Sequence, residues 1–203
     1  VAYFGRAADP TGLDYWTESG ITTSKFAADM YAQAEFKDSY GSKSTEAQVD
    51  QIYQNLFDRA ADVDGLLYWT KQIDLGVLKV AEIATHLIWA AKNNDGSSDD
   101  KTALTNRTNA AVAYTAKVKE STAAILAYAP TSSDPWTAGD NITEAVSYMS
   151  GIDKDTPSTT AGIAASVTTI VNNGTQSGKK SFTLTTGVNT FTGGDSADTF
   201  DAL

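Results

Sequence analysis

The sequence predicts a mainly α-helical fold: duplicated helix-turn-helix repeats, further packed helices, and then a short β segment. Three observations lead to this prediction. One stretch occurs twice, as Phe4–Glu18 and Phe57–Lys71, with ten of fifteen positions identical. Apolar residues recur at helical spacing through most of the first 174 residues. The composition then shifts to Gly and Ser, followed by alternating Thr, Val and Phe, which is typical of strands.

We therefore expect two parts in the chain. Residues 1–174 are predicted to form a helical domain, and residues 175–203 a linker and the start of a β region. The helical domain divides into two repeats and a helical extension, which we place at about 1–41, 49–93 and 98–174. Because Val1 falls within an apparent helix, we also expect some N-terminal residues to be missing.

Charge and composition narrow the class of function. The net charge is −10 and the pI about 4.4, which argues against nucleic acid or anionic membrane as the main partner and is compatible with divalent cations. The absence of cysteine excludes disulfides and thiol chemistry. No apolar run is long enough for a transmembrane segment, and no signal peptide is visible. Abundant Ser, Thr, Ala, Gly and Asn favour an exported bacterial surface protein.

The duplicated stretch reads as a turn that starts a helix. Asp9 and Asp62 stand where a helix N-cap belongs, so their carboxylates should accept hydrogen bonds from free backbone N–H groups. Gly12 and Gly65 indicate a close approach of the backbone to a neighbour or an unusual dihedral angle. Each copy therefore predicts a corner between two helices.

Charged and aromatic residues flank this corner. Arg6 and Arg59 lie three residues before the capping aspartates, within reach of an ion pair across the turn. Trp16 and Trp69 are placed to anchor the new helix in the core. Two interpretations stay open: a purely structural corner, or one that contacts a sugar or Ca²⁺.

Helical periodicity and turn residues set the expected helix boundaries. A capping box of Thr45 and Gln48 is predicted to start one helix, and Gly41 and Gly76 to follow the ends of two others. The other main helices are predicted over residues 9–19, 22–40, 63–74, 78–92 and 100–128, and in two later segments that end near 151 and 174. Pro130–Pro135 is expected to be a loop.

Catalytic residues are not indicated. His86 lies near the apolar stripe of its helix, where a histidine is usually packed and hydrogen-bonded. No Gly-x-Ser-x-Gly motif is present. The acidic loop 93–100 does not match an EF-hand, because the glutamate at the twelfth position is missing, so a solvated turn and helix cap is favoured. A carboxylate pair brought together by folding stays an alternative.

The end of the chain carries a different pattern. Residues 182–192 predict strand with a turn at Gly187, and residues 193–201 resemble the nonapeptide Gly-Gly-x-Gly-x-Asp-x-apolar-x of Ca²⁺-binding β-rolls, with Ser196 in place of the third glycine. The candidate metal ligands are Asp195 and Asp198 in this segment, and Asp62 and Asp64 in the second turn. A strand without metal is an equal alternative for the nonapeptide.

With these residues in view, the chain resembles a known family. The Phe-x-Arg-Ala-Ala-Asp-x-x-Gly-Leu-x-Tyr-Trp turn resembles the DUF4214 repeats of bacterial surface proteins, and residues 184–193 are similar to the start of the β-roll in RTX-type S-layer proteins and adhesins. Ala34-Glu35-Phe36 fits the usual ending of the repeat, whereas Ile88-Trp89-Ala90 does not, so the two copies need not bind alike.

The resemblance implies a protein exported by type I secretion to the outer face of the outer membrane. In S-layer proteins of this kind the N-terminal helical domain anchors the lattice to the O-polysaccharide of lipopolysaccharide, and the β-roll takes up Ca²⁺. The expected function is thus a non-enzymatic anchoring domain whose partners are the O-antigen and neighbouring copies in a lattice. The alternative is a spacer or protein-binding domain of an RTX adhesin.

Sugar binding calls for aromatic faces with a few polar partners. We expect the candidates to be Arg6, Tyr15, Trp16, Arg59, Tyr68, Trp69 and Trp136, with Trp89 as a further exposed-aromatic candidate. Which of these aromatic side chains reach solvent depends on the fold.

Overall fold

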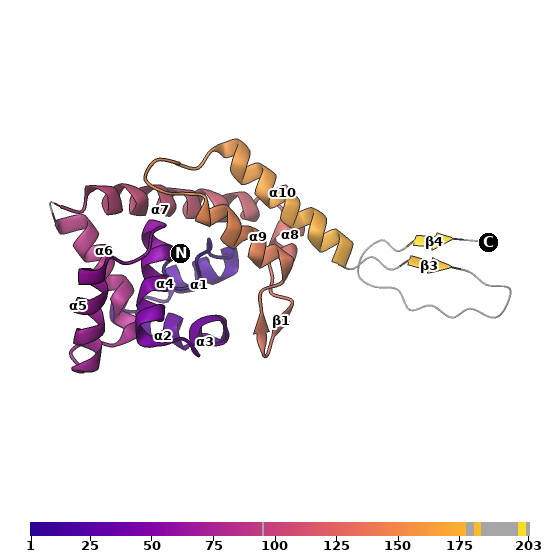
Figure 1. The fold of residues 1–203 in the computed structure, drawn as a ribbon. Helices are drawn as coiled ribbons and strands as arrows, with labels where there is room; N and C mark the ends of the chain where they lie inside the picture. Colours follow the sequence, from indigo (N-terminus) through magenta and orange to yellow (C-terminus); the bar gives the residue numbers. More distant parts are fainter. Residues whose placement is uncertain (95, 178–180, 184–198, 202–203) are drawn as a thin grey trace.

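Helices dominate the protein, as predicted. The computed structural model describes residues 1–94, 96–177, 181–183 and 199–201. The helices are α1 (Pro10–Glu18), α2 (Thr23–Ala32), α3 (Ala34–Tyr40), α4 (Thr45–Phe57), α5 (Val63–Asp74), a 3-10 turn (Val80–Glu82), α6 (Ile83–Asn93), α7 (Ser98–Lys119), α8 (Thr122–Ala127), α9 (Gly139–Ser150) and α10 (Thr160–Ser177). The strands are β1 (Ser132–Ser133), β2 (Trp136–Thr137), β3 (Ser181–Thr183) and β4 (Thr199–Asp201) (Figure 1).

Local chemistry explains where α4 starts. Ser44 is its N-cap, and the Ser44 hydroxyl accepts a hydrogen bond from the Ala47 N–H at 3.3 Å. The predicted capping box of Thr45 and Gln48 is therefore wrong by one residue. Gln48 is instead buried, and its amide donates to the Lys43 carbonyl at 3.0 Å.

Two segments predicted as single helices are broken. Gln33 adopts an extended conformation, with φ −61° and ψ 145°, and separates α2 from α3. No Gly or Pro marks this break in the sequence. The second break lies between α7 and α8, where the Ser121 hydroxyl accepts from the Ala124 N–H and caps a new helix.

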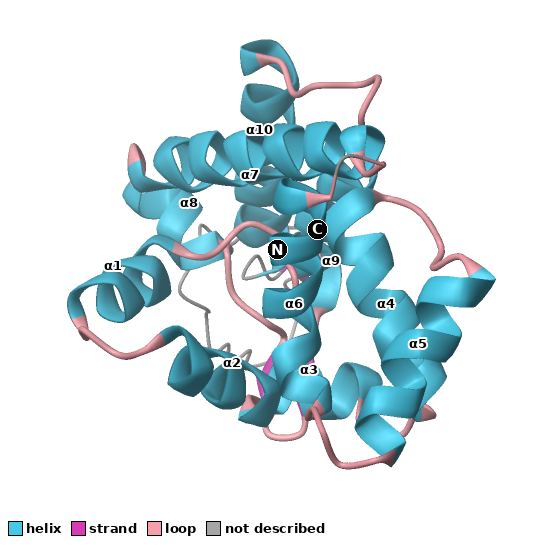
Figure 2. Cartoon of the chain, turned by 90° about the vertical axis from the view of Figure 1, so that its left-hand side faces the viewer, coloured by secondary structure: helices cyan, strands magenta, loops and turns pink. Residues whose placement is uncertain are grey.

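One apolar core lies under the first half of the chain. Helix α4 supplies its centre, because Val49 and Ile52 are fully buried there together with Phe36 of α3 and Ile83 of α6. Figure 2 shows α1 and α5 on opposite sides of the helical body. The amphipathic stripe predicted for α4 therefore faces the core.

Helix α7 joins this core to a second one. Near its start Leu104 packs in the first core, and near its end Tyr114 and Val118 are buried against the later helices. Figure 1 shows α10 beside α8 and α9, and Ile163 and Ile170 of α10 are buried in the second core. The helical extension thus packs on the two repeats rather than standing apart.

The end of the helical part differs from the prediction. Helix α10 continues to Ser177, so the predicted linker boundary at residue 174 falls inside a helix. The loop expected over Pro130–Pro135 contains β1, which pairs in antiparallel fashion with β2 directly after it. Strands β3 and β4 pair in parallel, with Ser181 opposite Thr199. Most of the strand predicted over 182–192 lies outside the described residues.

No described helix combines the length and apolar character needed to cross a bilayer.

Candidate functional site

The duplicated turn has the same capping geometry in both copies. Asp9 accepts a hydrogen bond from the Gly12 N–H at 2.6 Å, and Asp62 accepts one from the Gly65 N–H at 2.8 Å. A Cβ atom at Gly12 would lie 2.8 Å from a carboxylate oxygen of Asp9, and one at Gly65 would lie 2.7 Å from the Tyr53 hydroxyl. Both predicted N-caps are confirmed, and at each glycine a Cβ atom would crowd a side-chain oxygen.

The sequence suggested an ion pair between Arg6 and Asp9, but Arg6 pairs with Glu35. Its Nε and Nη2 atoms donate to the two carboxylate oxygens of Glu35, each at 2.6 Å, and Nη1 donates to the Ala7 carbonyl. Arg6 is buried. Burial by itself lowers the pKa of Arg6, but the hydrogen bonds and charge interactions with Glu35 and Tyr128 together outweigh it and hold the pKa above its ordinary value.

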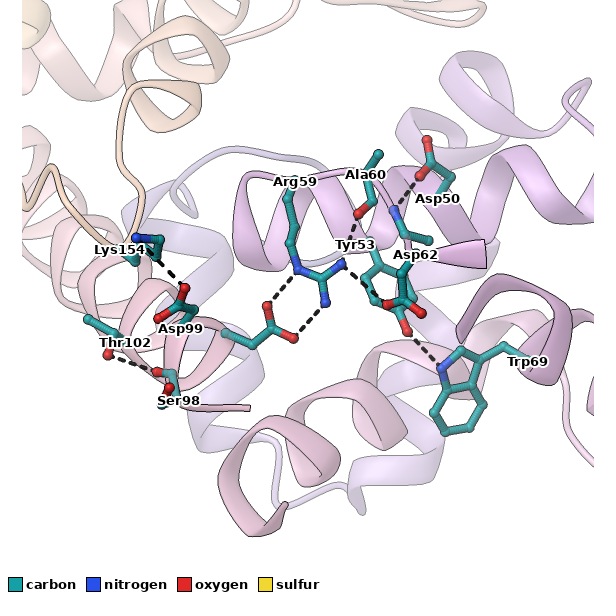
Figure 3. Close-up of polar contacts among 12 residues, drawn as sticks. Asp50, Tyr53, Arg59, Ala60, Asp62, Trp69, Ser98, Asp99, Thr102 and Lys154 are labelled. Atoms are coloured by element: carbon teal, nitrogen blue, oxygen red, sulfur yellow. Dashed lines mark hydrogen bonds and ion pairs between the residues drawn. The ribbon is translucent and has the colours of Figure 1, made fainter. Parts of the chain in front are cut away.

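Arg59 makes the corresponding contacts in the second copy. Its Nε and Nη2 atoms donate to the two oxygens of Asp100 at 2.7 Å, and Nη1 donates to the Ala60 carbonyl (Figure 3). The distance from Arg59 Nη1 to Asp62 Oδ2 is longer, at 3.6 Å. The predicted ion pair across the turn is therefore weaker than the pair of Arg59 with Asp100. The hydrogen bonds with Asp100 raise the pKa of Arg59.

The two arginines find carboxylates in different elements. Glu35 belongs to α3 of the first copy, whereas α6 of the second copy contains no acidic residue. Asp100, in the first turn of α7, supplies the missing carboxylate. The repeats are therefore equivalent at the turn and different in their second halves.

Arg107 was not singled out from the sequence. It is 2 % exposed, and its guanidinium donates to the Asn55 carbonyl at 2.9 Å, the Ile152 carbonyl at 2.6 Å and Asp58 at 3.0 Å. Burial lowers its pKa. An arginine in a polar helix gives no sequence signal of burial. The sequence therefore does not predict this link between α4, α7 and the segment after α9, which only the folded structure reveals.

A recess lined by aromatic side chains lies on the surface between α5 and α6. Its volume is about 500 Å³. Its lining residues are Tyr68, Trp69, Gln72, Val77, Leu78, His86, Trp89, Ala90 and Asn94. The described lining contains no Asp, Glu, Lys or Arg side chain, so it combines apolar rings with neutral hydrogen-bonding groups.

The aromatic rings of this recess are held in defined positions. The Trp69 indole N–H donates to the Tyr53 hydroxyl at 3.0 Å (Figure 3). The Tyr68 ring meets the Trp69 ring edge to face at 4.9 Å, and the His86 ring lies 5.9 Å from Trp69. Trp69 is half-buried and packs on the core, as predicted.

Three rings of the recess are open to solvent. Tyr68 is 56 % exposed and Trp89 is 63 % exposed. His86 is also exposed, so its predicted packing in the apolar stripe is wrong. The buried face of α6 is formed by Ile83, Ala84, Leu87 and Ala91, and His86 lies at the edge of that face.

The other predicted sugar-binding residues do not lie in this recess. Arg6, Trp16 and Trp136 line a separate, larger cleft of about 750 Å³. Tyr15 is 64 % exposed on α1, and Arg59 is engaged with Asp100. This recess therefore brings together Tyr68, Trp69 and Trp89 of the predicted candidates and adds His86, whereas Arg6, Trp16 and Trp136 meet at the larger cleft.

Nothing in the described part of the chain forms a cluster of three acidic or histidine side chains that could hold a metal ion. Asp62 serves as a helix cap, and the hydrogen bond from Gly65 lowers its pKa. Asp64 follows in the first turn of α5. Asp195 and Asp198 lie outside the described residues.

Comparisons with known proteins identify one region. No curated protein and no solved structure matches the chain. The matching segment begins within α2 and ends just after α6, so it holds the second half of the first repeat and all of the second. Residues 27–95 match the family model described as "Domain of unknown function (DUF4214)", so the chain carries a DUF4214 domain in this segment.

Proposed function

We propose that this chain is a non-enzymatic, glycan-binding anchoring domain of a secreted bacterial surface protein, and that its ligand is the O-polysaccharide of lipopolysaccharide. The observation that carries the proposal is the recess between α5 and α6, where Tyr68, Trp69, His86 and Trp89 converge. The recess lies wholly within the DUF4214 segment.

The chemistry of the recess suits a sugar. Tyr68 and Trp89 leave more than half of their surface in water, which is costly for large aromatic side chains unless a ligand covers them. The apolar face of a pyranose ring can stack on such side chains, while Gln72 and Asn94 offer amides to its hydroxyl groups. The lack of Asp, Glu, Lys and Arg side chains in the described lining favours a neutral sugar residue.

The surface-layer context rests on the resemblance and on one structural feature. Ser181 in β3 pairs in parallel with Thr199 in β4, which follows it by 18 residues, the length of two nonapeptides. This spacing supports the start of a β-roll, in which Ca²⁺ would bind between successive turns. Export by type I secretion and contacts with neighbouring copies in an S-layer belong to the same proposal.

A second candidate is a protein-binding or spacer domain of an RTX adhesin. The observation in its favour is an exposed apolar row on α5. Val63 and Leu67 are 72 % and 64 % exposed and lie one turn apart, close in sequence to Tyr68. Such a row fits a protein contact as well as a surface rim.

Binding to purified lipopolysaccharide separates the two candidates. The chain is immobilised and titrated with smooth lipopolysaccharide, which carries O-polysaccharide, and with rough lipopolysaccharide, which lacks it, with and without Ca²⁺. Saturable binding to the smooth form alone is the expected result. Equal binding to both forms, or none to either, would reject anchoring through O-polysaccharide and favour the adhesin.

A further inference from the structure

The two copies of the duplicated stretch differ mainly on one face of α5. Phe4–Glu18 and Phe57–Lys71 differ at five of fifteen positions, and one of these, Asp58, precedes α5. The other four lie within α5 at i, i+1, i+4 and i+8, inside an arc of about 100° of the helix. All four are exposed, and we call them the outward face of α5: Val63, Asp64, Leu67 and Lys71.

In the first copy the chain itself covers the equivalent face. Pro10, which corresponds to Val63, is buried. Asp14, which corresponds to Leu67, accepts a hydrogen bond from the Lys119 ammonium of α7 at 2.7 Å. Helix α1 therefore presents this face to α7.

In the second copy the same face is open. Val63 and Leu67 leave more than half of their surface in water. Helix α5 packs mainly on α4, and Figures 1 and 2 both place it at the edge of the helical body. Half of the large apolar side chains exposed in the described chain belong to residues 63–77. Such a concentration on one element indicates contact with another surface.

The charges on the outward face identify the partner. Asp64 and Lys71 form no ion pair within the described part of the chain, and Leu67 lies between them. If two copies of α5 pack antiparallel about a two-fold axis near Leu67, Lys71 of each copy lies beside Asp64 of the other. The two Leu67 side chains then meet at the axis. The face is therefore complementary to itself in charge and apolar at its centre.

We propose that the outward face of α5 is a self-association surface, at which two copies of the chain form a symmetric antiparallel helix pair. One helix pair is a small interface, so the association is weak and reversible. None of the four residues of this face lines the aromatic recess. The inference therefore goes beyond glycan binding, and its test contains no lipopolysaccharide.

Sedimentation equilibrium of the chain over a series of concentrations measures the association. The buffer contains about 0.15 M salt, which limits the repulsion between two acidic copies to a Debye length of about 8 Å. We expect the average mass to rise from monomer toward dimer. A chain that stays monomeric up to about 1 mM would overturn the proposal.

Replacing Leu67 tests whether this face holds the dimer. Leu67→Lys should weaken dimerisation at least tenfold, because it brings two ammonium groups together at the axis. Leu126→Lys, at an exposed leucine of α8, is the matched control and should dimerise like the wild type. Dimerisation of Leu67→Lys as strong as that of the wild type would also overturn the proposal.

Charge-swapped variants test the antiparallel arrangement. Asp64→Lys brings like charges together at both contacts, and Lys71→Asp does the same, so each alone should dimerise at least tenfold more weakly than the wild type. Glu18→Lys makes the same change of charge at an exposed position of α1 and should have no effect.

An equimolar mixture of Asp64→Lys and Lys71→Asp restores opposite charges at both contacts. The mixture should dimerise about as strongly as the wild type, which would also show that both variants are folded. A mixture that associates as weakly as its separate components would overturn the proposal.

Discussion

Arg59 holds Asp100 through two hydrogen bonds of 2.7 Å, although the two residues are 41 positions apart and belong to different predicted units. Arg6 holds Glu35 in the same way within the first repeat. One arginine geometry therefore closes both turns, and in the second copy the helical extension provides the carboxylate. The extension and the repeats are in this way parts of one folding unit.

The two ion pairs should differ in their contribution to stability. The side chains of Arg6 and Glu35 are 10 % and 12 % exposed, whereas Arg59 is 38 % exposed. Breaking a buried pair leaves an unpaired buried charge and costs about 3–5 kcal/mol, while a partly exposed pair is worth about 1 kcal/mol. We therefore expect Glu35→Gln to lower the free energy of unfolding in urea much more than Asp100→Asn. Equal losses would contradict this difference.

Gly65 should not tolerate a side chain. Its Cβ would lie 2.7 Å from the Tyr53 hydroxyl and 3.1 Å from the Asp62 carboxylate. Gly65→Ala should therefore cost about 1–3 kcal/mol through crowding, seen as a lower midpoint of thermal unfolding. Gly151→Ala is the matched control, since the nearest atom would lie 3.6 Å away, and its midpoint should stay close to that of the wild type.

Arg107 should resist conservative replacement. Lysine keeps the positive charge but cannot reproduce the planar fork that reaches Asn55, Asp58 and Ile152. Arg107→Lys leaves buried acceptors without donors, and we expect a loss of about 2–3 kcal/mol in the free energy of unfolding. Arg59→Lys, at a more exposed site, should lose less. An Arg107→Lys protein as stable as the wild type would show that these hydrogen bonds do not contribute to the free energy of unfolding.

Asp62 should make the free energy of unfolding depend on pH in the acidic range. The hydrogen bond from Gly65 lowers the pKa of Asp62 in the folded chain below its ordinary value of 3.8. The stabilisation is therefore present above that value and is lost as the pH falls through the lower folded pKa. Between about pH 5 and pH 2, Asp62→Asn should lose less stability than the wild type, because its cap does not titrate. Asp64→Asn is the control. If its stability decreased with falling pH as gradually as that of Asp62→Asn, the assignment of the pH dependence to Asp62 would be wrong.

Much of the fold follows from local sequence signals. The N-caps Asp9 and Asp62, the stripe of α4 and the range of α5 are all predictable, because each depends on residues within one or two turns. The break at Gln33 has no such signal, since neither Gly nor Pro is present. Phe36, three residues after the break, is buried in the first core.

The candidate site was only partly predictable. Tyr68 and Trp69 stand out through the repeat, but their neighbours His86 and Trp89 come from a helix whose apolar residues surround most of its circumference. Sequence periodicity does not determine which of these rings face solvent. The partners of Arg6 and Arg59 were missed for a related reason, because Glu35 and Asp100 come close only after folding.

The central claim is that the recess between α5 and α6 binds O-polysaccharide, and substitution of Trp89 tests it most directly. Trp89 is 63 % exposed, so Trp89→Ala should leave the thermal midpoint nearly unchanged. Leu126→Ala, at a residue that is 74 % exposed and absent from the recess lining, is the matched control. Affinities of the three proteins for smooth lipopolysaccharide are measured side by side. We expect a loss of tenfold or more, equal to about 1.4 kcal/mol, for Trp89→Ala alone. Unchanged affinity of that variant, with the wild type binding the smooth form, would contradict the claim.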